Sequence, residues 1–93
     1  MENKNSYETV IILRKENYNE SLNKVKNYIE NLTKIEKIEE VGLKRLAYEV
    51  KNQKTGYYVV IYFKSTVENI RELEGLYRID ENVLKFIVVR KDD

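Results

Sequence analysis

The residue types that most often carry out catalysis are missing from this chain, because its 93 residues include no histidine and no cysteine. Nucleophile pairs of the Ser/His and Cys/His kinds and thiolate metal sites are therefore excluded. The adjacent carboxylates Glu39 and Glu40 stand in a strand-like stretch, where neighbouring side chains point to opposite faces, so they make a poor acid/base pair. We expect a protein that is not an enzyme and that holds no metal or cofactor.

A phosphate site is a second chemical possibility, in the loop that follows the first apolar run. Arg14 and Asn17 stand there, and both side chains can bind an anion. Nothing else nearby resembles a phosphate cradle, and the three glycines of the chain are too scattered to form a nucleotide-binding loop. We interpret the segment as a solvated loop.

Basic side chains gather around one predicted hairpin, although the net charge of the whole chain is only +1. The bases there, which outnumber Glu49, are Lys44, Arg45, Lys51 and Lys54. Arg90 and Lys91 form a second basic pair, directly before the two final aspartates. Such residues could contact nucleic-acid phosphates, in which case binding would depend on salt. The alternative is an ordinary solvated surface.

The stretch TGYYVVIY, residues 55–62, partly matches the RNA-recognition motif of a sheet that binds RNA by stacking. The residues that match the pattern are Gly56, Tyr57, Val60 and Tyr62. Tyr58 stands where a small residue is usual, and Val59 replaces the main stacking aromatic. The match is weak, and a central strand explains the same residues.

Composition predicts one soluble, cytoplasmic domain over residues 1–93. Hydrophobic residues make up 42% of the chain, enough for one core but not for two. The longest apolar run, residues 57–63, is far too short to cross a membrane, and the N-terminal MENKNSYE lacks the features of a signal peptide.

Hydrophobic periodicity predicts strands at 6–13, 35–50, 57–63 and 82–90, with residues 51–56 as a hairpin connection. The first predicted helix has the apolar stripe Leu22, Val25, Ile29 and Leu32, and the second has Val67, Ile70, Leu73 and Leu76 or Tyr77. Asn17 or Asn19 is the expected cap of the first helix, with Glu20 completing a capping box for Asn17, and Ser65 with Glu68 is expected to cap the second.

The order β-α-β-β-α-β predicts an α+β fold, the ferredoxin-like sandwich of four antiparallel strands with both helices on one face. The other face would then be uncovered, and strand alternation predicts that it carries Val10, Ile12, Tyr58, Val60, Tyr62, Ile87 and Val89. Alternation is ambiguous on the last strand, where Val83, Phe86 and Val88 cannot all share one face. A surface with this many apolar residues indicates a binding face, although large apolar residues also occur on solvent-exposed faces of antiparallel sheets.

The stretch EEVGLKRLAY, residues 39–48, combines charges with apolar residues around a single glycine. At a sheet edge, the charges would oppose edge-to-edge pairing with another chain, and Gly42 would permit a bulge. On this interpretation Leu43, Arg45 and Ala47 border the uncovered face. The alternative is a charged edge strand that has no partner.

The whole chain resembles the bacterial small-subunit ribosomal protein six family. The resemblance is carried by Tyr7-Glu8, by the block from Ile35 to Tyr48 that contains GLKRLAY, by Gly56-Tyr57-Tyr58, by Asn82-Val83 and by Val88-Val89. It implies a non-enzymatic component of the small ribosomal subunit. The family binds the central domain of the small-subunit rRNA as a heterodimer with small-subunit ribosomal protein eighteen.

The resemblance also implies which residues contact each partner. The expected rRNA-binding residues are Lys4, Lys44, Arg45, Lys54, Arg90 and Lys91, and the uncovered face is the expected protein-partner face. Asn5 and Ser6 stand where the family often has arginine, and Asp92-Asp93 stand in place of a longer tail, so we expect altered contacts at both ends.

Two classes of function follow from the sequence. The first is the ribosomal protein, expected to be a monomer when free, with no membrane and no small-molecule substrate. The second is a free-standing ferredoxin-like module that uses its apolar face for self-association or for a small ligand. Association without RNA would favour the second class.

Overall fold

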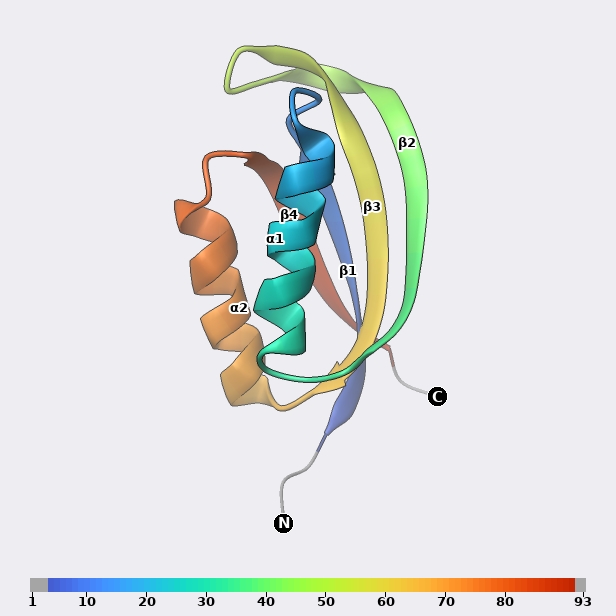
Figure 1. The fold of residues 1–93 in the computed structure, drawn as a ribbon, viewed down its shortest axis with the longest axis vertical. Coiled ribbons are helices and arrows are strands. Elements are labelled where there is room, and N and C mark those ends of the chain that lie inside the picture. Colours follow the sequence, from blue (N-terminus) through green and yellow to red (C-terminus); the bar gives the residue numbers. More distant parts are fainter. Residues whose placement is uncertain (1–3, 92–93) are drawn as a thin grey trace.

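The structure, a computed structural model that describes residues 4–91, is a four-stranded antiparallel sheet with two helices packed against one face (Figure 1). The elements are β1 (Asn5–Leu13), α1 (Tyr18–Glu30), β2 (Ile35–Val50), β3 (Gln53–Ser65), α2 (Val67–Ile79) and β4 (Val83–Lys91). The strand order β2-β3-β1-β4 places β1 and β3 in the centre and β2 and β4 at the edges. The predicted ferredoxin-like fold is confirmed.

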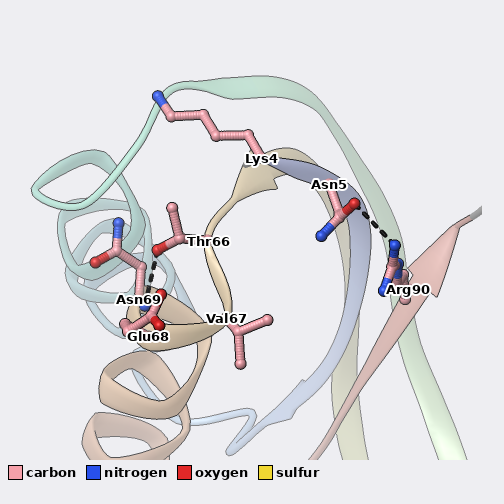
Figure 2. A pocket seen from close by; sticks show the side chains of 7 residues that line it. All are labelled: Lys4, Asn5, Thr66, Val67, Glu68, Asn69 and Arg90. Carbon is pink, nitrogen blue, oxygen red and sulfur yellow. Dashed lines mark hydrogen bonds between the residues drawn. The ribbon is translucent and has the colours of Figure 1, made fainter. Parts of the chain in front are cut away.

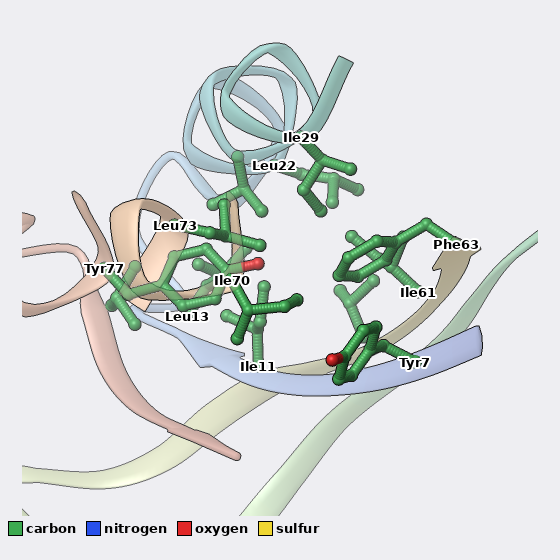
Figure 3. Packing of buried hydrophobic residues seen from close by; sticks show 13 residues of the cluster. Tyr7, Ile11, Leu13, Leu22, Ile29, Ile61, Phe63, Ile70, Leu73 and Tyr77 are labelled. Carbon is green, nitrogen blue, oxygen red and sulfur yellow. The ribbon is translucent and has the colours of Figure 1, made fainter. Parts of the chain in front are cut away.

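The core lies between the helices and the sheet. Alternate residues of the two central strands point into it, and Figure 3 shows them facing the apolar stripes of α1 and α2. The core residues that are at most 1% exposed include Ile11, Leu13, Val25, Ile29, Val59, Ile61, Phe63, Leu73 and Tyr77. These residues therefore fix which face of the sheet the helices cover.

The predicted helix caps are confirmed only in part. Asn17, and not Asn19, is the N-cap of α1, but it has a left-handed backbone (φ 57°) and its side chain makes no cap hydrogen bond, so the predicted capping box is wrong. The cap of α2 is Thr66 rather than Ser65, because the Thr66 hydroxyl accepts a hydrogen bond from the Asn69 amide at 3.2 Å. The buried side of α2 ends with Tyr77, while Val67 remains 45% exposed.

The hairpin between β2 and β3 turns more tightly than expected. Only Lys51 and Asn52 form the turn, and both have positive φ (48° and 66°), as a two-residue hairpin loop requires. Gly56 is therefore not part of the connection but lies buried inside β3. A Cβ atom at Gly56 would lie only 2.4 Å from Cγ2 of Ile12, so glycine is needed for the close approach of β3 to β1.

The predicted bulge at Gly42 is confirmed. The bulge inverts the alternation of β2, so side chains after it point to the opposite face from the one that regular alternation predicts. Gly42 has φ +108°, and the register of β2 against β3 shifts between Glu40 and Gly42. Before the bulge, Ile38 pairs with Ile61 and faces the helices. After it, Leu43 pairs with Tyr57 on the helix side and Arg45 pairs with Thr55, so the expectation that Leu43 and Arg45 border the uncovered face is wrong. Lys44 and Leu46 take that side instead. Ala47 does border that face, because it lines a hollow there with Ile12 and Tyr58.

The far end of the hairpin closes over one end of the uncovered face. Leu46 packs there against Ile12 and Leu84, in a small second cluster that is separate from the main core. Lys51 Nζ also donates a hydrogen bond to the Val83 carbonyl at 3.1 Å, which ties the turn to the start of β4. A register shift between β1 and β4 at Leu13 places Leu84 on this side, and it lets Val83, Phe86 and Val88 all pack on the helix side.

Candidate nucleic-acid and partner interface

Two titratable groups near the core, Asp80 and Tyr28, are hydrogen-bonded to each other in a structural contact. Asp80, which is 6% exposed, accepts hydrogen bonds from the Tyr28 hydroxyl (3.0 Å) and from the Asn82 amide (2.9 Å). Burial, and then the Asp80 carboxylate, raise the pKa of Tyr28. Asp80 thus fastens α1 to the turn before β4. Residues 4–91 contain no group of three or more side chains that could hold a metal ion.

The two catalytic possibilities raised by the sequence are also resolved. Glu39 and Glu40 point to opposite faces, as predicted, since they pair with Val60 and Val59 respectively. Arg14 serves the fold: its Nε donates to the Glu81 carbonyl at 3.0 Å, and its amide donates to the Asn82 carbonyl at 2.9 Å. Arg14 therefore holds the turn before β4 in place.

The uncovered face of the sheet carries the predicted apolar residues in one continuous strip. Strand pairing places Val10 between Val60 and Ile87, and Ile12 beside Tyr58. Ile87 and Val89 are 52% and 43% exposed, whereas Val10, Tyr58, Val60 and Tyr62 are half-buried. Ile12 is only 8% exposed, because the hairpin end covers it. We call these residues the open-face strip: Val10, Ile12, Tyr58, Val60, Tyr62, Ile87 and Val89.

Ion pairs border the open-face strip at the end near the start of β1. Lys91 Nζ lies 3.4 Å from the Glu8 carboxylate, and Lys37 Nζ lies 3.0 Å from the Glu39 carboxylate. Lys37 also stands over the Tyr62 ring, 5.8 Å from its centroid. The pairing with Glu39 raises the pKa of Lys37. Charge at this end of the face is largely balanced within the chain.

The six predicted rRNA-binding residues fall into two groups at opposite ends of the strands. Lys44, Arg45 and Lys54 lie at the hairpin end, where Lys44 pairs with Gly56 and Arg45 pairs with Thr55. Lys4, Arg90 and Lys91 lie at the other end, around the start of β1 and the end of β4 (Figure 1). The two groups are not joined, and within each group neighbouring strand residues, Lys44 and Arg45 or Arg90 and Lys91, point to opposite faces of the sheet.

Two residues of the group at the start of β1, Lys4 and Arg90, line an open, polar hollow next to the first turn of α2 (Figure 2). Arg90 donates a hydrogen bond to Asn5 Oδ1 at 2.9 Å, while the Lys4 side chain extends away from Arg90. Asn5 therefore engages Arg90 at the start of β1. Asp92 and Asp93 lie outside the described residues.

Tyr57, which partly matches the RNA-recognition motif, is not placed to stack on an RNA base at the uncovered face. Tyr57 faces the helices and stacks on Tyr18 of α1, with ring centroids 3.9 Å apart. Its hydroxyl donates to the Glu40 carboxylate at 2.7 Å. That hydrogen bond, followed by burial, raises the pKa of Tyr57 to about 12. The ring is therefore engaged within the chain and is not presented on the uncovered face.

Sequence reasoning missed two residues at the hairpin end, Tyr48 and Lys85. Tyr48 is 68% exposed, and the Nζ atom of Lys85 lies 5.5 Å from the centroid of its ring and 3.4 Å from its hydroxyl oxygen. In the sequence, the alternation of Leu46, Tyr48 and Val50 predicts that Tyr48 faces a core, and its exposure shows that this prediction is wrong. No local signal could have paired it with a residue 37 positions further along the chain, because only the curl of the hairpin brings them together.

These features define a class of protein: a small βαββαβ domain with an apolar sheet face, basic groups at both ends of its strands and no assembled catalytic centre among residues 4–91. No helix within those residues is long and apolar enough to span a membrane. A family model described as ribosomal protein S6 matches residues 6–90.

The chain belongs to the ribosomal protein S6 family, whose members are structural proteins of the small ribosomal subunit and not enzymes. It is 46% identical over 91 residues to small ribosomal subunit protein bS6 of Helicobacter acinonychis, covering 92% of this chain and 64% of that relative. The chain thus spans slightly less than two thirds of that relative's length. It is 37% identical to the bS6 protein of Caldanaerobacter subterraneus, covering 95% of this chain and 98% of that relative.

Solved structures agree with this assignment. The crystal structure of 30S ribosomal protein S6 from Thermotoga maritima superposes with a TM-score of 0.86 at 32% identity, covering 96% of this chain and 89% of that one. A second Thermotoga maritima protein, of uncharacterized function, superposes with a TM-score of 0.65 at 15% identity, covering 97% of this chain and all of that one. The second likeness shows the fold alone.

Proposed function

We propose that this chain is a structural constituent of the small ribosomal subunit, works in the cytoplasm, and binds the central domain of the small-subunit rRNA together with small-subunit ribosomal protein eighteen. The observation that supports this most directly is the open-face strip. Two of its large apolar residues, Ile87 and Val89, remain more than 40% exposed. Exposed apolar surface of this kind is typical of a docking site for another protein.

The basic groups supply the second half of the proposal. Within residues 4–91, Lys44, Arg45 and Lys54 make no ion pair, so their charges are available to an outside anion. RNA phosphates would meet that charge, and the partner protein would cover the open-face strip. The division of labour explains why a chain of net charge +1 can bind RNA: it supplies part of the contact surface and its partner supplies the rest.

The test is association with small ribosomal subunits, measured as salt is raised and with the partner protein present or depleted. We expect stoichiometric retention that needs the partner and weakens with salt. Replacing Arg45 and Lys54 with alanine should lower the slope of log affinity against log salt by about 0.7 to 0.9 for each lost phosphate contact. The matched control replaces Lys26 and Arg71, which lie on the helices, and should leave the slope unchanged.

The competing hypothesis is a free-standing module that uses the open-face strip for itself. It predicts concentration-dependent dimerisation without RNA, which sedimentation of the purified chain would detect. We expect a monomer. A chain that elutes freely from subunits under every salt condition would contradict the ribosomal proposal and favour this alternative.

A further inference from the structure

Tyr48 holds an unusual position at the hairpin end. Between Arg45 and Val50 the strand β2 advances five residues, while its partner β3 moves only from Thr55 to Gln53. The intervening residues of β2 must therefore bow out of the ladder. Tyr48 lies in this bowed segment, and it is 68% exposed although an aromatic ring is costly to leave in water.

Tyr48 borders two hollows of different character. The first is lined by Tyr48 together with Arg45, Glu49 and Lys54, and it is mostly polar. The second is mostly apolar, and its lining includes Tyr48, Ile12, Tyr58 and Lys85. The exposed Tyr48 side chain thus contributes to a charged surface and to an apolar surface.

Charge at this end differs from charge at the opposite end of the sheet. Lys37 and Lys91 are ion-paired with Glu39 and Glu8. Within residues 4–91, Lys85 has no carboxylate partner, and its recorded contacts are with the ring and hydroxyl of Tyr48. Arg45 and Lys54 are likewise without ion pairs in the described part of the chain, and the positive side chains at the hairpin end outnumber the single carboxylate of Glu49 that lines the same hollow.

We propose that Tyr48 stacks on an unpaired RNA base, with Arg45 and Lys54 contacting the adjoining phosphates and Lys85 flanking the ring. This inference rests on the proposed rRNA binding and names the nucleotide state that the hairpin end accepts. Exposed aromatic rings beside Arg and Lys are the usual platform for single-stranded nucleic acid, because every base has a face that can stack. A base-paired helix cannot offer such a face, so the nucleotide must be unpaired.

An RNA occupant fits this site better than an apolar protein segment does. A protein segment lying over Tyr48 would bury Lys85 and Arg45 without counter-charges, which is unfavourable. An RNA strand brings a phosphate with each base, so the same cations become favourable contacts. The open-face strip, with its balanced charges, remains the surface for the protein partner.

The experiment measures the affinity of the full chain for small-subunit rRNA in the presence of small-subunit ribosomal protein eighteen. Tyr48→Leu should weaken binding by roughly fivefold or more, because stacking is lost. Tyr48→Phe, which keeps the ring, should bind like the parent chain. Ile79→Ala is the control and should bind like the parent chain, since Ile79 is a large side chain that is 77% exposed at the end of α2, outside both proposed binding surfaces.

The salt dependence identifies stacking as the cause. Tyr48→Leu should leave the slope of log affinity against log salt unchanged, whereas Arg45→Ala should lower it. A photo-reactive benzoylphenylalanine placed at position 48 should cross-link to rRNA. Cross-linking only to the partner protein, or equal affinity of Tyr48→Leu and the parent, overturns the stacking proposal while rRNA binding stands. If the parent chain itself shows no salt-sensitive binding, both proposals fall.

Discussion

Ile11 and Ile87 lie on neighbouring strands of one sheet, yet Ile11 is 1% exposed and Ile87 is 52% exposed. Ile11 points to the helices and belongs to the main core, whereas Ile87 lies in the open-face strip. Both faces are rich in β-branched and aromatic residues, so residue type does not separate them. The difference teaches that this fold uses one face for its own stability and leaves a similar face uncovered, which is the face that we propose for partners.

The largest expected effect comes from making the same substitution on each face. Ile11→Ala should lower the free energy of unfolding by about 2 to 5 kcal/mol, because it removes buried methyl groups and leaves a cavity. Ile87→Ala should cost less than about 1 kcal/mol, since half of the side chain is already in water. Urea denaturation of the two variants measures both values. Equal losses would mean that the uncovered face also stabilises the fold.

Leu46→Ala tests the end of the uncovered face that the hairpin closes. Leu46 is 9% exposed in a cluster with Ile12 and Leu84. We expect a loss of about 2 kcal/mol, at the low end for a buried leucine because so small a cluster can partly collapse. Denaturant unfolding measures the loss. A loss no larger than that of Ile87→Ala would show that the hairpin end contributes little to stability.

Gly56→Ala probes the point where β3 passes close to β1. The added Cβ would meet Ile12 Cγ2 at 2.4 Å and the Leu13 carbonyl oxygen at 3.3 Å, so we expect a loss of about 1 to 3 kcal/mol from overpacking. Gly75→Ala is the control, because Gly75 lies in α2 and nothing is within 4 Å of the Cβ atom that the substitution adds. It should stabilise the chain by about 0.4 to 1 kcal/mol, so thermal midpoints should move in opposite directions.

The smallest effect concerns Tyr57 at the edge of the covered face. Its neutral hydroxyl donates to Glu40, and its pKa is raised from 10.0 to about 12. A raised folded-state pKa means that the stabilisation is complete below pH 10 and is lost as the pH rises through about 12. Absorbance titration should show that Glu40→Gln moves one late-ionising tyrosine, Tyr57, back toward 10, while the buried Tyr77, whose pKa burial also raises, still ionises late. A titration curve that Glu40→Gln leaves unchanged would exclude this hydrogen bond as the cause.

Much of the local structure was predictable because it depends on neighbours in sequence. The β2 boundaries at Ile35 and Val50 were predicted exactly where they fall, and the bulge at Gly42 followed from one glycine inside a strand pattern. Helix caps were less predictable, since several residues near each helix start can serve. At α2 the cap was predicted one residue too early, at Ser65 instead of Thr66.

The candidate site was predicted only in part, because it depends on long-range placement. Alternation along single strands identified the open-face strip, since strands β1 and β3 are regular there. It failed beyond Gly42, where the bulge exchanged the two faces of β2 and put Leu43 on the helix side. It also could not bring Lys85 to Tyr48, because that contact exists only once the hairpin has curled over β1 and β4.

The sequence by itself determined the fold class, the lack of histidine and cysteine chemistry, and the set of apolar residues available for a binding face. Periodicity and composition carry that information directly, because they act through adjacent residues. Only the tertiary structure decided which charges remain unpaired and which ring stands exposed. The physical reason is that ion pairing and burial depend on distances between strands, and one shifted register changes every side chain that follows it.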